Sequence, residues 1–443
     1  MTGAGGPDST SRAARQSERH VRRRIAVGTG VLLVVVAVVL AAAVLVPSRA
    51  GGPADLAAGT GTSTSLRSRS ATPGSTRAST TARPATTARP ATTTSTTSTT
   101  STTQPASITL LFGGDLLPHT PLTAQAARYG HYVNRRFDFD PMLAPMKPII
   151  SAADVAICHM ETPVAPDQAH LTGYPAFGGP VELVDAAKAA GYDGCSNASN
   201  HSLDRGRDGI AATLARFDQD GLRHAGTART AQEASTITMY DVRNVRVAHL
   251  SYAYDFNGYK IPADAPWSVN KIDPSTIKAD AAKAKAQGAD LVVVSVHWGT
   301  EYDSHPSPYQ RDMAAQMLTS PAIDLVIGCH AHVVQPIDQV AGRFVVWGMG
   351  NQLANQPEVP RSDGLTAIAT AVRGADGRWR IAGVQGVPTW IEPGSFRVLP
   401  VVRTLADPST PAALRDQLRA SYDRSAPTIL RDHTPGVTVT PRP

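Results

Sequence analysis

The chain has little cysteine and few aromatic residues. Three cysteines in 443 residues, Cys158, Cys195 and Cys329, exclude a small secreted domain held together by several disulfides. They allow at most one intramolecular bridge, and each lies in an apolar run where a small buried side chain is the default interpretation. Aromatic residues make up only 5% of a chain rich in alanine, threonine and serine, which predicts that part of it does not pack into a core.

Net positive charge is confined to the N-terminal region. The formal net charge is +6, but residues 1–106 contain twelve arginines, no lysine and three acidic residues, and so hold +9. The remaining 337 residues contain 30 basic and 33 acidic side chains, and so hold −3. Binding to nucleic acid needs a basic face on the folded part of a protein. We therefore expect no nucleic-acid partner.

An uncharged apolar run near the N-terminus predicts a transmembrane anchor. Residues 25–46 carry no charge and are long enough to cross a bilayer as a helix. Residues 1–24 form a basic tail with six arginines, whereas only Arg49 follows the run closely. The positive-inside rule then places the tail in the cytoplasm and the rest outside the cell. A cleaved signal peptide is the alternative, because Ala41 to Ala43 could form a cleavage site, but the length of the run favours a single-pass anchor in the cell membrane.

The composition changes twice after the apolar run. Residues 47–106 are mostly serine, threonine, proline, alanine and arginine, and the hexamer TTARPA occurs twice. Such a segment has too few apolar side chains to offset the entropy lost on ordering, so we predict a disordered linker. From residue 107, short apolar runs alternate with helical patterns, which predicts one α/β domain over residues 107–403. Residues 404–443 predict one helix, over residues 412–422, and a proline-rich tail.

Six apolar runs predict strands of this domain. They cover residues 108–112, 154–158, 245–251, 291–296, 325–327 and 344–347. Residues 208–221 predict a helix, because Ile210, Leu214 and Phe217 fall on one helical face. Residues 365–391 predict strands without helices between them, so we expect a mixed sheet system.

Polar side chains follow four of these runs and a fifth strand-like segment, YDGCSNAS from residue 192, at the point where each one ends. They are Asp115, Glu161, Asn200, His201, His297, His330 and His332. Ligands of open α/β sheets collect beyond the carboxyl ends of the strands, so these side chains are expected to form one site. Carboxylate, amide and imidazole donors without paired thiolates suit Mn²⁺, Fe²⁺ or Zn²⁺ better than Ca²⁺. The sequence predicts one or two divalent metal ions, which could activate a water molecule.

Taken singly, several of these residues have ordinary structural explanations. Asp115 follows two glycines as in a turn, His297 ends a strand, and Asn200 could cap a helix. The pair His330 and His332 is the most specific feature, because alternate residues of an extended segment point to the same side. Their joint placement at strand ends favours the metal site.

Six stretches resemble the poly-γ-glutamate capsule synthesis protein family, CapA, whose domain is similar to calcineurin-like metallophosphatases. They are LLFGGDLLPH from residue 110, ADVAICHMETPV from 153, SNASNHSLDRGRDGIAATL from 196, VVVSVHWGTEY from 292, IGCHAHVVQPI from 327 and VVWGMGN from 345. They follow the family order across roughly residues 108–400. The resemblance implies a four-layer α/β/β/α metallophosphatase-like sandwich with its site at the rim.

The resemblance also implies roles for individual residues. Asp115 resembles the first metal carboxylate and Glu161 the bridging carboxylate. Asn200 would bind the second metal, and the remaining metal ligands would be His297, His330 and His332. His201 would be the catalytic acid, oriented by Asp204.

Two positions depart from the family pattern. A metallophosphatase begins its site with D-x-H, but position 117 is Leu117, so the first metal lacks that imidazole unless His119 replaces it. His159 stands where the family commonly has asparagine and could bind metal, donate a hydrogen bond or pack; we expect it to pack or to hydrogen-bond. The missing histidine weakens the expectation of two tightly held metals and of ordinary phosphatase activity.

Four further residues are candidates for contact with a substrate. Trp298, Glu301 and Tyr302 follow His297, and the family resemblance implies that they line the cleft. The alternative is that Trp298 packs beneath the strand end while Glu301 is exposed. Arg205 could contact an anionic polymer or could be a solvated loop arginine.

Three functions remain open at this point. The favoured one is a membrane-anchored, extracellular, metal-dependent protein of capsule or poly-γ-glutamate synthesis or export, with an anionic polypeptide or envelope polymer and a membrane-bound synthesis complex as partners. The second is a stand-alone metal-dependent envelope phosphoesterase or other hydrolase of the metallophosphatase type. The third is a peptide epimerase on the same fold. The substrate, the metal and the oligomeric state do not follow from the sequence.

Overall fold

The computed structural model describes residues 106–443. The predicted basic tail and transmembrane anchor lie outside the described residues, as does the predicted linker except for its last residue. Within residues 106–443, no helix has both the length and the apolar character needed to cross a bilayer.

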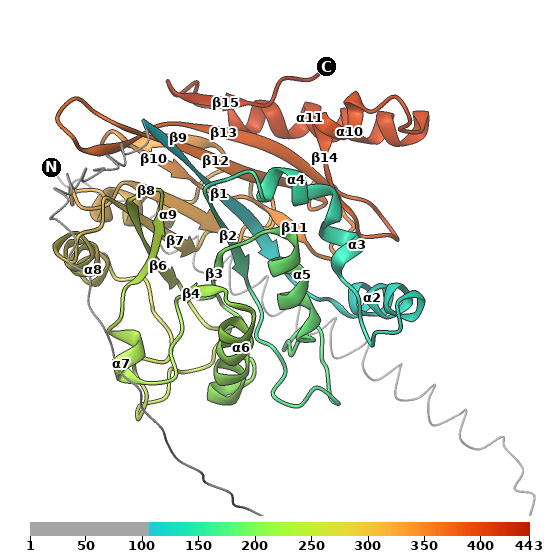
Figure 1. The fold of residues 1–443 in the computed structure, drawn as a ribbon, viewed down its shortest axis with the longest axis horizontal. Coiled ribbons are helices and arrows are strands. Elements are labelled where there is room, and N and C mark those ends of the chain that lie inside the picture. Colours follow the sequence, from blue (N-terminus) through green and yellow to red (C-terminus); the bar gives the residue numbers. More distant parts are fainter. Residues whose placement is uncertain (1–105) are drawn as a thin grey trace, which may run out of the picture. The chain divides into compact units, whose positions relative to one another are not determined.

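Two β-sheets form the centre of the described part (Figure 1). The first sheet has the strand order β14-β13-β12-β1-β2-β3-β4, with β11 beside β1 and β15 beside β13. Its strands are β1 (Ser107–Leu116), β2 (Val155–Met160), β3 (Gly194–Ser196), β4 (Arg223–Ala225), β11 (Asn351–Leu353), β12 (Asp363–Arg373), β13 (Trp379–Ile391), β14 (Val398–Pro400) and β15 (Val437–Val439).

The second sheet has the order β5-β6-β7-β8-β10-β9. Its strands are β5 (Thr238–Val242), β6 (Val245–Ala253), β7 (Leu291–His297), β8 (Leu325–Cys329), β9 (Ile337–Val340) and β10 (Arg343–Val346). Both sheets contain parallel and antiparallel pairs, since β7 is parallel to β8 while β5 is antiparallel to β6. The predicted mixed sheet system is confirmed.

Helices cover the outer face of each sheet. The first sheet packs against α2 (Thr120–Tyr132), α3 (Asp140–Leu143), the 3₁₀ helix η1 (Ala144–Met146), α4 (Lys147–Ile150), α5 (Glu182–Ala190) and α6 (Gly206–Asp220). The second sheet packs against α8 (Pro274–Ala286) and α9 (Pro308–Met317). A third apolar cluster lies between the two sheets. The layers are helices, sheet, sheet and helices, so the α/β fold expected from the sequence is confirmed.

The strand sequences explain this layering. In β1, Ile108, Leu110 and Phe112 pack between the sheets, whereas Leu111 packs against the helices. In β7, Val293 packs between the sheets and Val294 faces α8 and α9. Because both faces of these strands are buried, their sequences are continuous apolar runs rather than alternating ones.

The C-terminal segment is part of the fold rather than a free tail. The helix α11 (Ala412–Ile429) begins where the sequence predicts it but continues past residue 422, and Ile429 is buried in the cluster between the sheets. The expected proline-rich tail contains β15, which pairs in parallel with β13. Two short helices complete the chain, α7 (Ala231–Ala234) and α10 (Val401–Ala406).

Cys158 and Cys195 form a disulfide between neighbouring strands. They are register partners of β2 and β3, with 4.4 Å between their Cα atoms. Cys329, at the end of β8, is a buried free thiol. The sequence allowed one bridge among three cysteines, and the strand pairing selects which two residues form it.

Candidate metal centre

The predicted site residues meet beyond the ends of five strands. Asp115 lies near the end of β1, His297 ends β7, and the others follow β2, β3 and β8. All seven are buried: Asp115, Glu161, Asn200, His201, His297, His330 and His332. The strands β1, β2 and β3 run parallel in the first sheet and β7 and β8 run parallel in the second, so their carboxyl ends open on one rim.

The backbone after β8 turns so that two imidazoles enter the centre. His330 and His332 both have positive φ, at 96° and 55°. Such backbone is unfavourable for residues with a side chain, and it persists where the surrounding structure holds it, often at functional sites. The two rings lie 6.0 Å apart between their centroids. The i, i+2 spacing therefore brings both imidazoles to one centre through this turn rather than through a regular strand.

One group of donors consists of Asp115, Glu161 and His332. Asp115 Oδ2 lies 3.3 Å from His332 Nδ1, and His332 Nε2 lies 3.8 Å from Glu161 Oε1. One ligand atom of each of the three residues lies within 4.8 Å of the other two. This spacing fits three ligands around one cation.

A second group shares Glu161 and adds His297 and His330. Their ligand atoms also lie within 4.8 Å of one another, and His297 Nε2 is 3.8 Å from Glu161 Oε1. Asn200 joins this group, because its Oδ1 lies 2.8 Å from His297 Nε2. Glu161 thus belongs to both donor groups.

Unpaired buried atoms support a cation at this centre. In the described part of the chain, Asp115 Oδ1, both carboxylate oxygens of Glu161 and His330 Nδ1 are buried without a hydrogen-bond partner. Leaving buried carboxylate oxygens unpaired is costly, and a bound cation removes that cost. The donors fit the expected divalent metal, and oxygen and imidazole ligands are compatible with Mn²⁺, Fe²⁺ and Zn²⁺.

The pKa directions of His297 and His330 suit metal ligands, whereas those of Glu161 and His332 favour the protonated forms when no cation is bound. Burial, followed by the neighbouring imidazoles, lowers the pKa of His297 well below its usual value, so its ring is neutral and can donate a lone pair. Burial likewise lowers the pKa of His330 to about 3. Burial raises the pKa of the Glu161 carboxyl. Burial opposes protonation of His332, but the carboxylates of Glu161 and Asp115 raise its pKa to about 9.

His201 is oriented by Asp204, as the resemblance implies. His201 Nδ1 lies 2.7 Å from Asp204 Oδ2, which also accepts a hydrogen bond from the backbone N–H of Phe177 at 2.7 Å. The ring of Phe177 packs edge-on against His201 at 4.9 Å. This arrangement fixes the orientation of the His201 ring through its Nδ1.

His119 and His159 both hydrogen-bond near the centre. His119 Nδ1 accepts a hydrogen bond from the Asn355 backbone N–H at 3.2 Å, and His119 belongs to none of the donor groups found among the described residues. His159 Nδ1 lies 2.8 Å from Ser196 Oγ, and His159 Nε2 lies 2.9 Å from His297 Nδ1. His159 therefore hydrogen-bonds, as expected.

Trp298 does not line a cleft. Its side chain is fully buried in the cluster beneath the second sheet, stacks on Trp347 at 5.8 Å and donates Nε1–H to the Trp347 carbonyl at 3.1 Å. Strand alternation explains the correction, because Trp298 follows His297 and so points to the opposite face of the sheet. Glu301 is exposed, and its carboxylate can approach His330 and His332.

Tyr302 is at the surface beside the centre. It is 42% exposed, and its ring stacks on His332 with 6.1 Å between centroids. The guanidinium of Arg361 lies 3.6 Å above the Tyr302 ring. Tyr302 is thus placed to contact a substrate, and Arg361 is a cation beside it that the sequence did not indicate.

Arg205 is engaged within the protein. Its guanidinium donates to Thr172 Oγ1 and, at 2.6 Å, to the carbonyl of Ala176. It therefore holds the loop that precedes α5, and a role in contact with an anionic polymer stays a prediction. Loop contacts between segments far apart in the chain leave no pattern in the sequence.

Two asparagines also contact residues of the centre, although no role for either of them was predicted from the sequence. Asn351, the last residue of the VVWGMGN stretch, has its Oδ1 3.0 Å from His332 Nδ1. Asn257 Oδ1 accepts from Asn200 Nδ2 at 3.3 Å, and Asn257 Nδ2 lies 3.3 Å from His201 Nδ1. The motif gave a signal for Asn351, whereas nothing in the sequence distinguishes Asn257 from other loop asparagines.

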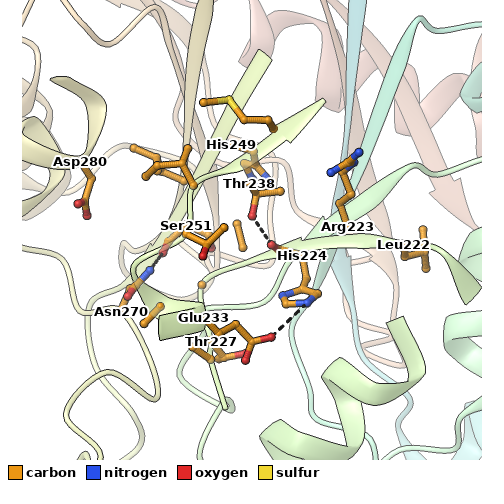
Figure 2. A pocket seen from close by; sticks show the side chains of 18 of the residues that line it. Leu222, Arg223, His224, Thr227, Glu233, Thr238, His249, Ser251, Asn270 and Asp280 are labelled. Atoms are coloured by element: carbon orange, nitrogen blue, oxygen red, sulfur yellow. Dashed lines mark hydrogen bonds and ion pairs between the residues drawn. The ribbon is translucent and has the colours of Figure 1, made fainter. Parts of the chain in front are cut away.

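A separate cavity of about 590 Å³ lies between β4, β5 and β6 (Figure 2). Several of its ionic side chains pair with one another. Arg229 binds Glu233 and Asp218, and His224 lies 3.9 Å from Glu233. Asp115 Oδ1 and the two carboxylate oxygens of Glu161, which are buried without a hydrogen-bond partner in the described chain, are therefore the stronger indication of a chemical site.

Comparison with known proteins places the chain among capsule-synthesis proteins. The chain is 28% identical over 263 residues to the capsule biosynthesis protein CapA of Bacillus anthracis, which covers 56% of this chain and 60% of that protein. It is 26% identical over 309 residues to the PGA biosynthesis protein CapA of Bacillus subtilis (strain 168), which covers 67% of this chain and 79% of that protein.

The structural comparison gives a match of lower sequence identity. The crystal structure of a hypothetical protein from Thermus thermophilus matches with a TM-score of 0.40 at 14% identity, over 65% of this chain and all of that chain. The family model described as bacterial capsule synthesis protein PGA_cap matches residues 109–356, a range that includes every donor of the candidate centre. The chain therefore belongs to the PGA_cap family of bacterial capsule synthesis proteins.

Proposed function

We propose that this protein acts with a divalent metal in the synthesis or export of an anionic polypeptide capsule, such as poly-γ-glutamate, at the cell envelope. The observation that carries the proposal is Glu161, whose two buried carboxylate oxygens have no hydrogen-bond partner in the described chain. Its Oε1 lies 3.8 Å from His297 Nε2 and 3.8 Å from His332 Nε2. The names of the Bacillus relatives, capsule and PGA biosynthesis proteins, supply the process.

The chemistry that fits the centre is metal-dependent hydrolysis of a phosphoester or amide bond in an envelope polymer. One or two bound Mn²⁺, Fe²⁺ or Zn²⁺ ions would supply electrophilic stabilisation and an activated water. Asp115, Glu161 and His332 would hold one ion, and Glu161, Asn200, His297 and His330 the other. His201, held by Asp204 at 2.7 Å, would hold or donate a proton at Nε2.

The proposed location is outside the cell, with the chain held by residues 25–46. The Cys158–Cys195 disulfide supports this location, because disulfides form and persist in oxidising compartments and are rare in the cytosol. The arginines of residues 1–24 support a cytoplasmic N-terminus.

Metal content and turnover of the full-length chain test the proposed chemistry. The chain, purified in detergent, is expected to bind close to one or two equivalents of Mn²⁺, Fe²⁺ or Zn²⁺. His201→Ala should abolish release of product from polyglutamate or from a phosphodiester probe while the metal content stays unchanged.

His170→Ala is the matched control. His170 also pairs with an aspartate three residues away, at 2.6 Å from Asp167, but its side chain is exposed. A chain that binds none of the three metals would refute the proposed centre. Unchanged surface polymer in cells lacking the gene would refute the role in capsule synthesis.

A further inference from the structure

His159 connects the candidate ligand His297 to Ser196 through a line of hydrogen bonds. His297 Nδ1 lies 2.9 Å from His159 Nε2, and His159 Nδ1 lies 2.8 Å from Ser196 Oγ. Ser196 Oγ donates to the carbonyl of Cys158 at 3.3 Å. The three side chains are each at most 2% exposed, so they hydrogen-bond to one another rather than to solvent.

If each hydrogen bond in this line is donated away from His297, then Nε2 of His297 keeps a lone pair that can bind a cation. Nε2 of His297 lies among the candidate ligands, 3.8 Å from Glu161 Oε1 and 2.8 Å from Asn200 Oδ1. For Nε2 to bind a cation, its lone pair must be on Nε2 and the ring proton on Nδ1. The Nδ1–H then donates to His159 Nε2, and His159 Nδ1–H donates to Ser196 Oγ. The Ser196 hydroxyl ends the line on a backbone carbonyl. Every donor in the line then has an acceptor.

We propose that His159 is a positioning residue that sets the tautomer and the ring orientation of His297, and that Ser196 holds His159 in turn. This inference rests on the cation centre of the proposed function. A group that accepts the second N–H of a ligating histidine raises the basicity of the ligand and fixes its ring.

The same hydrogen bonds argue against His159 as a ligand. His159 Nε2 lies 3.9 Å from Asp115 Oδ1, close enough to be considered for binding a cation with Asp115. However, the lone pair of Nε2 accepts from His297, and Nδ1 donates to Ser196, so neither nitrogen is free. The His159 and His297 rings are nearly parallel, with 4.9 Å between centroids and 26° between planes.

The line of hydrogen bonds is built on paired strands. His159 and Ser196 are register partners of β2 and β3, directly after the register pair Cys158 and Cys195. The disulfide between those cysteines fixes the separation of the strands one residue before the hydrogen bond. A positioning group on such rigid elements is held more closely than one on a loop.

Metal affinity of full-length variants tests the proposal. His159→Ala should weaken Zn²⁺ binding, measured by chelator competition, about ten- to a hundredfold, the range for loss of an outer partner. His159→Gln supplies an amide oxygen to His297 Nδ1–H and should restore most of the affinity. Ser196→Ala should weaken binding by less than His159→Ala. In all variants the visible spectrum of bound Co²⁺ should keep the coordination number of the unmodified chain.

His249→Ala is the matched control for loss of a buried imidazole. His249 is 1% exposed and hydrogen-bonds to a serine, with Nε2 2.9 Å from Ser295 Oγ, but it contacts no candidate ligand. It should change Zn²⁺ affinity less than twofold. An equal loss in His249→Ala, an unchanged affinity in His159→Ala, or a Co²⁺ spectrum that has lost one nitrogen ligand would overturn the proposal. If the unmodified chain binds no cation, the proposed function fails as well; if it binds and only the His159 effect is missing, this inference alone fails.

Discussion

Asp115 Oδ2 lies 3.3 Å from His332 Nδ1, although Asp115 belongs to the first sheet and His332 follows a strand of the second. Both side chains are buried, so their attraction is little screened by solvent. The imidazoles around Asp115, led by its hydrogen bond to His332, outweigh burial and hold the pKa of the Asp115 carboxyl below its usual value. The candidate centre therefore joins the two sheets electrostatically, and changes at the centre should alter the stability of the whole domain.

Removal of the cation should lower thermal stability through Glu161. A ligand present at a hundred times its Kd stabilises a protein by about 2.7 kcal/mol, so EDTA should lower the Tm of the unmodified chain. Glu161→Gln removes the shared carboxylate, and its Tm should respond to neither EDTA nor added Mn²⁺. Scanning calorimetry with and without chelator measures both effects.

Glu358→Gln controls for loss of an acidic side chain. Glu358 is exposed and pairs with Arg361 at 2.9 Å, so its variant should keep the full response to EDTA. If Glu161→Gln responded to EDTA as strongly as the unmodified chain, Glu161 would not be a ligand.

His249 should make the metal-free protein sensitive to acid. Burial lowers the pKa of His249 to about 3, whereas an unfolded histidine has a pKa of about 6.5. Below pH 6.5 the unfolded chain binds a proton that the folded chain excludes, so stability falls as the pH drops towards 3. Between about pH 7 and pH 4.5 this site accounts for a loss of about 2 to 3 kcal/mol.

The substitution His249→Gln isolates this contribution, because glutamine can still bond to Ser295 and does not titrate. Urea unfolding in EDTA at both pH values measures the loss of stability on acidification. This loss should be about 2 to 3 kcal/mol smaller in the variant than in the unmodified chain. An identical pH dependence in the two proteins would show that His249 is not buried in its neutral form.

Removal of the disulfide should destabilise the domain and weaken the centre. Cys158 and Cys195 are 37 residues apart, and closing a loop of that length stabilises a fold by about 4 kcal/mol in the chain-entropy model. The double variant Cys158→Ser with Cys195→Ser should lose a comparable amount in urea unfolding. Its cation affinity should also fall, because β2 and β3 lead directly to Glu161 and Asn200.

The reducing agent offers an independent check on this bridge. Dithiothreitol should shift the urea midpoint of the unmodified chain and leave that of the double variant in place. A midpoint that is the same for both proteins, with or without reductant, would contradict a stabilising bridge.

Substitution of Trp298 should reduce the stability of the fold, whereas substitution of Tyr302 should change the binding of substrate. Trp298 is fully buried, so Trp298→Ala should cost about 3 to 5 kcal/mol of stability through the cavity it leaves. Tyr302 is 42% exposed, so Tyr302→Ala should cost much less stability and should change KM for a polymer substrate more than Trp298→Phe does. Urea unfolding and steady-state kinetics on the same proteins separate the two roles. A small stability loss for Trp298→Ala would argue that this residue is not a core residue.

Much of the fold was predictable because its strands are buried on both faces. The runs at residues 108–112, 291–296 and 325–327 each lie within an observed strand. The helix α6 (Gly206–Asp220) has Ile210, Leu214 and Phe217 buried on one face, as its periodicity predicts. The strand β15 was missed, because three residues between prolines and a turn carry too little pattern to be distinguished from a tail.

The donors of the centre were predictable, but their contacts were not. Strand ends and the H-x-H spacing predict that Asp115, Glu161 and His332 lie together, and the structure brings them together. The partner of His159 could not be predicted, because a hydrogen bond between side chains on different sheets depends on how the sheets pack.

The kinds of ligand, and the strand ends that present them, follow from the amino-acid sequence, because local apolar runs set where strands stop. The face of the sheet and the partner of each side chain follow from how the strands pack. The alternation that places His297 in the centre sends Trp298 into the core, and the pairing of β2 with β3 joins Cys158 to Cys195 and His159 to Ser196. These contacts depend on the register and packing of separate strands, which no local pattern of residues encodes.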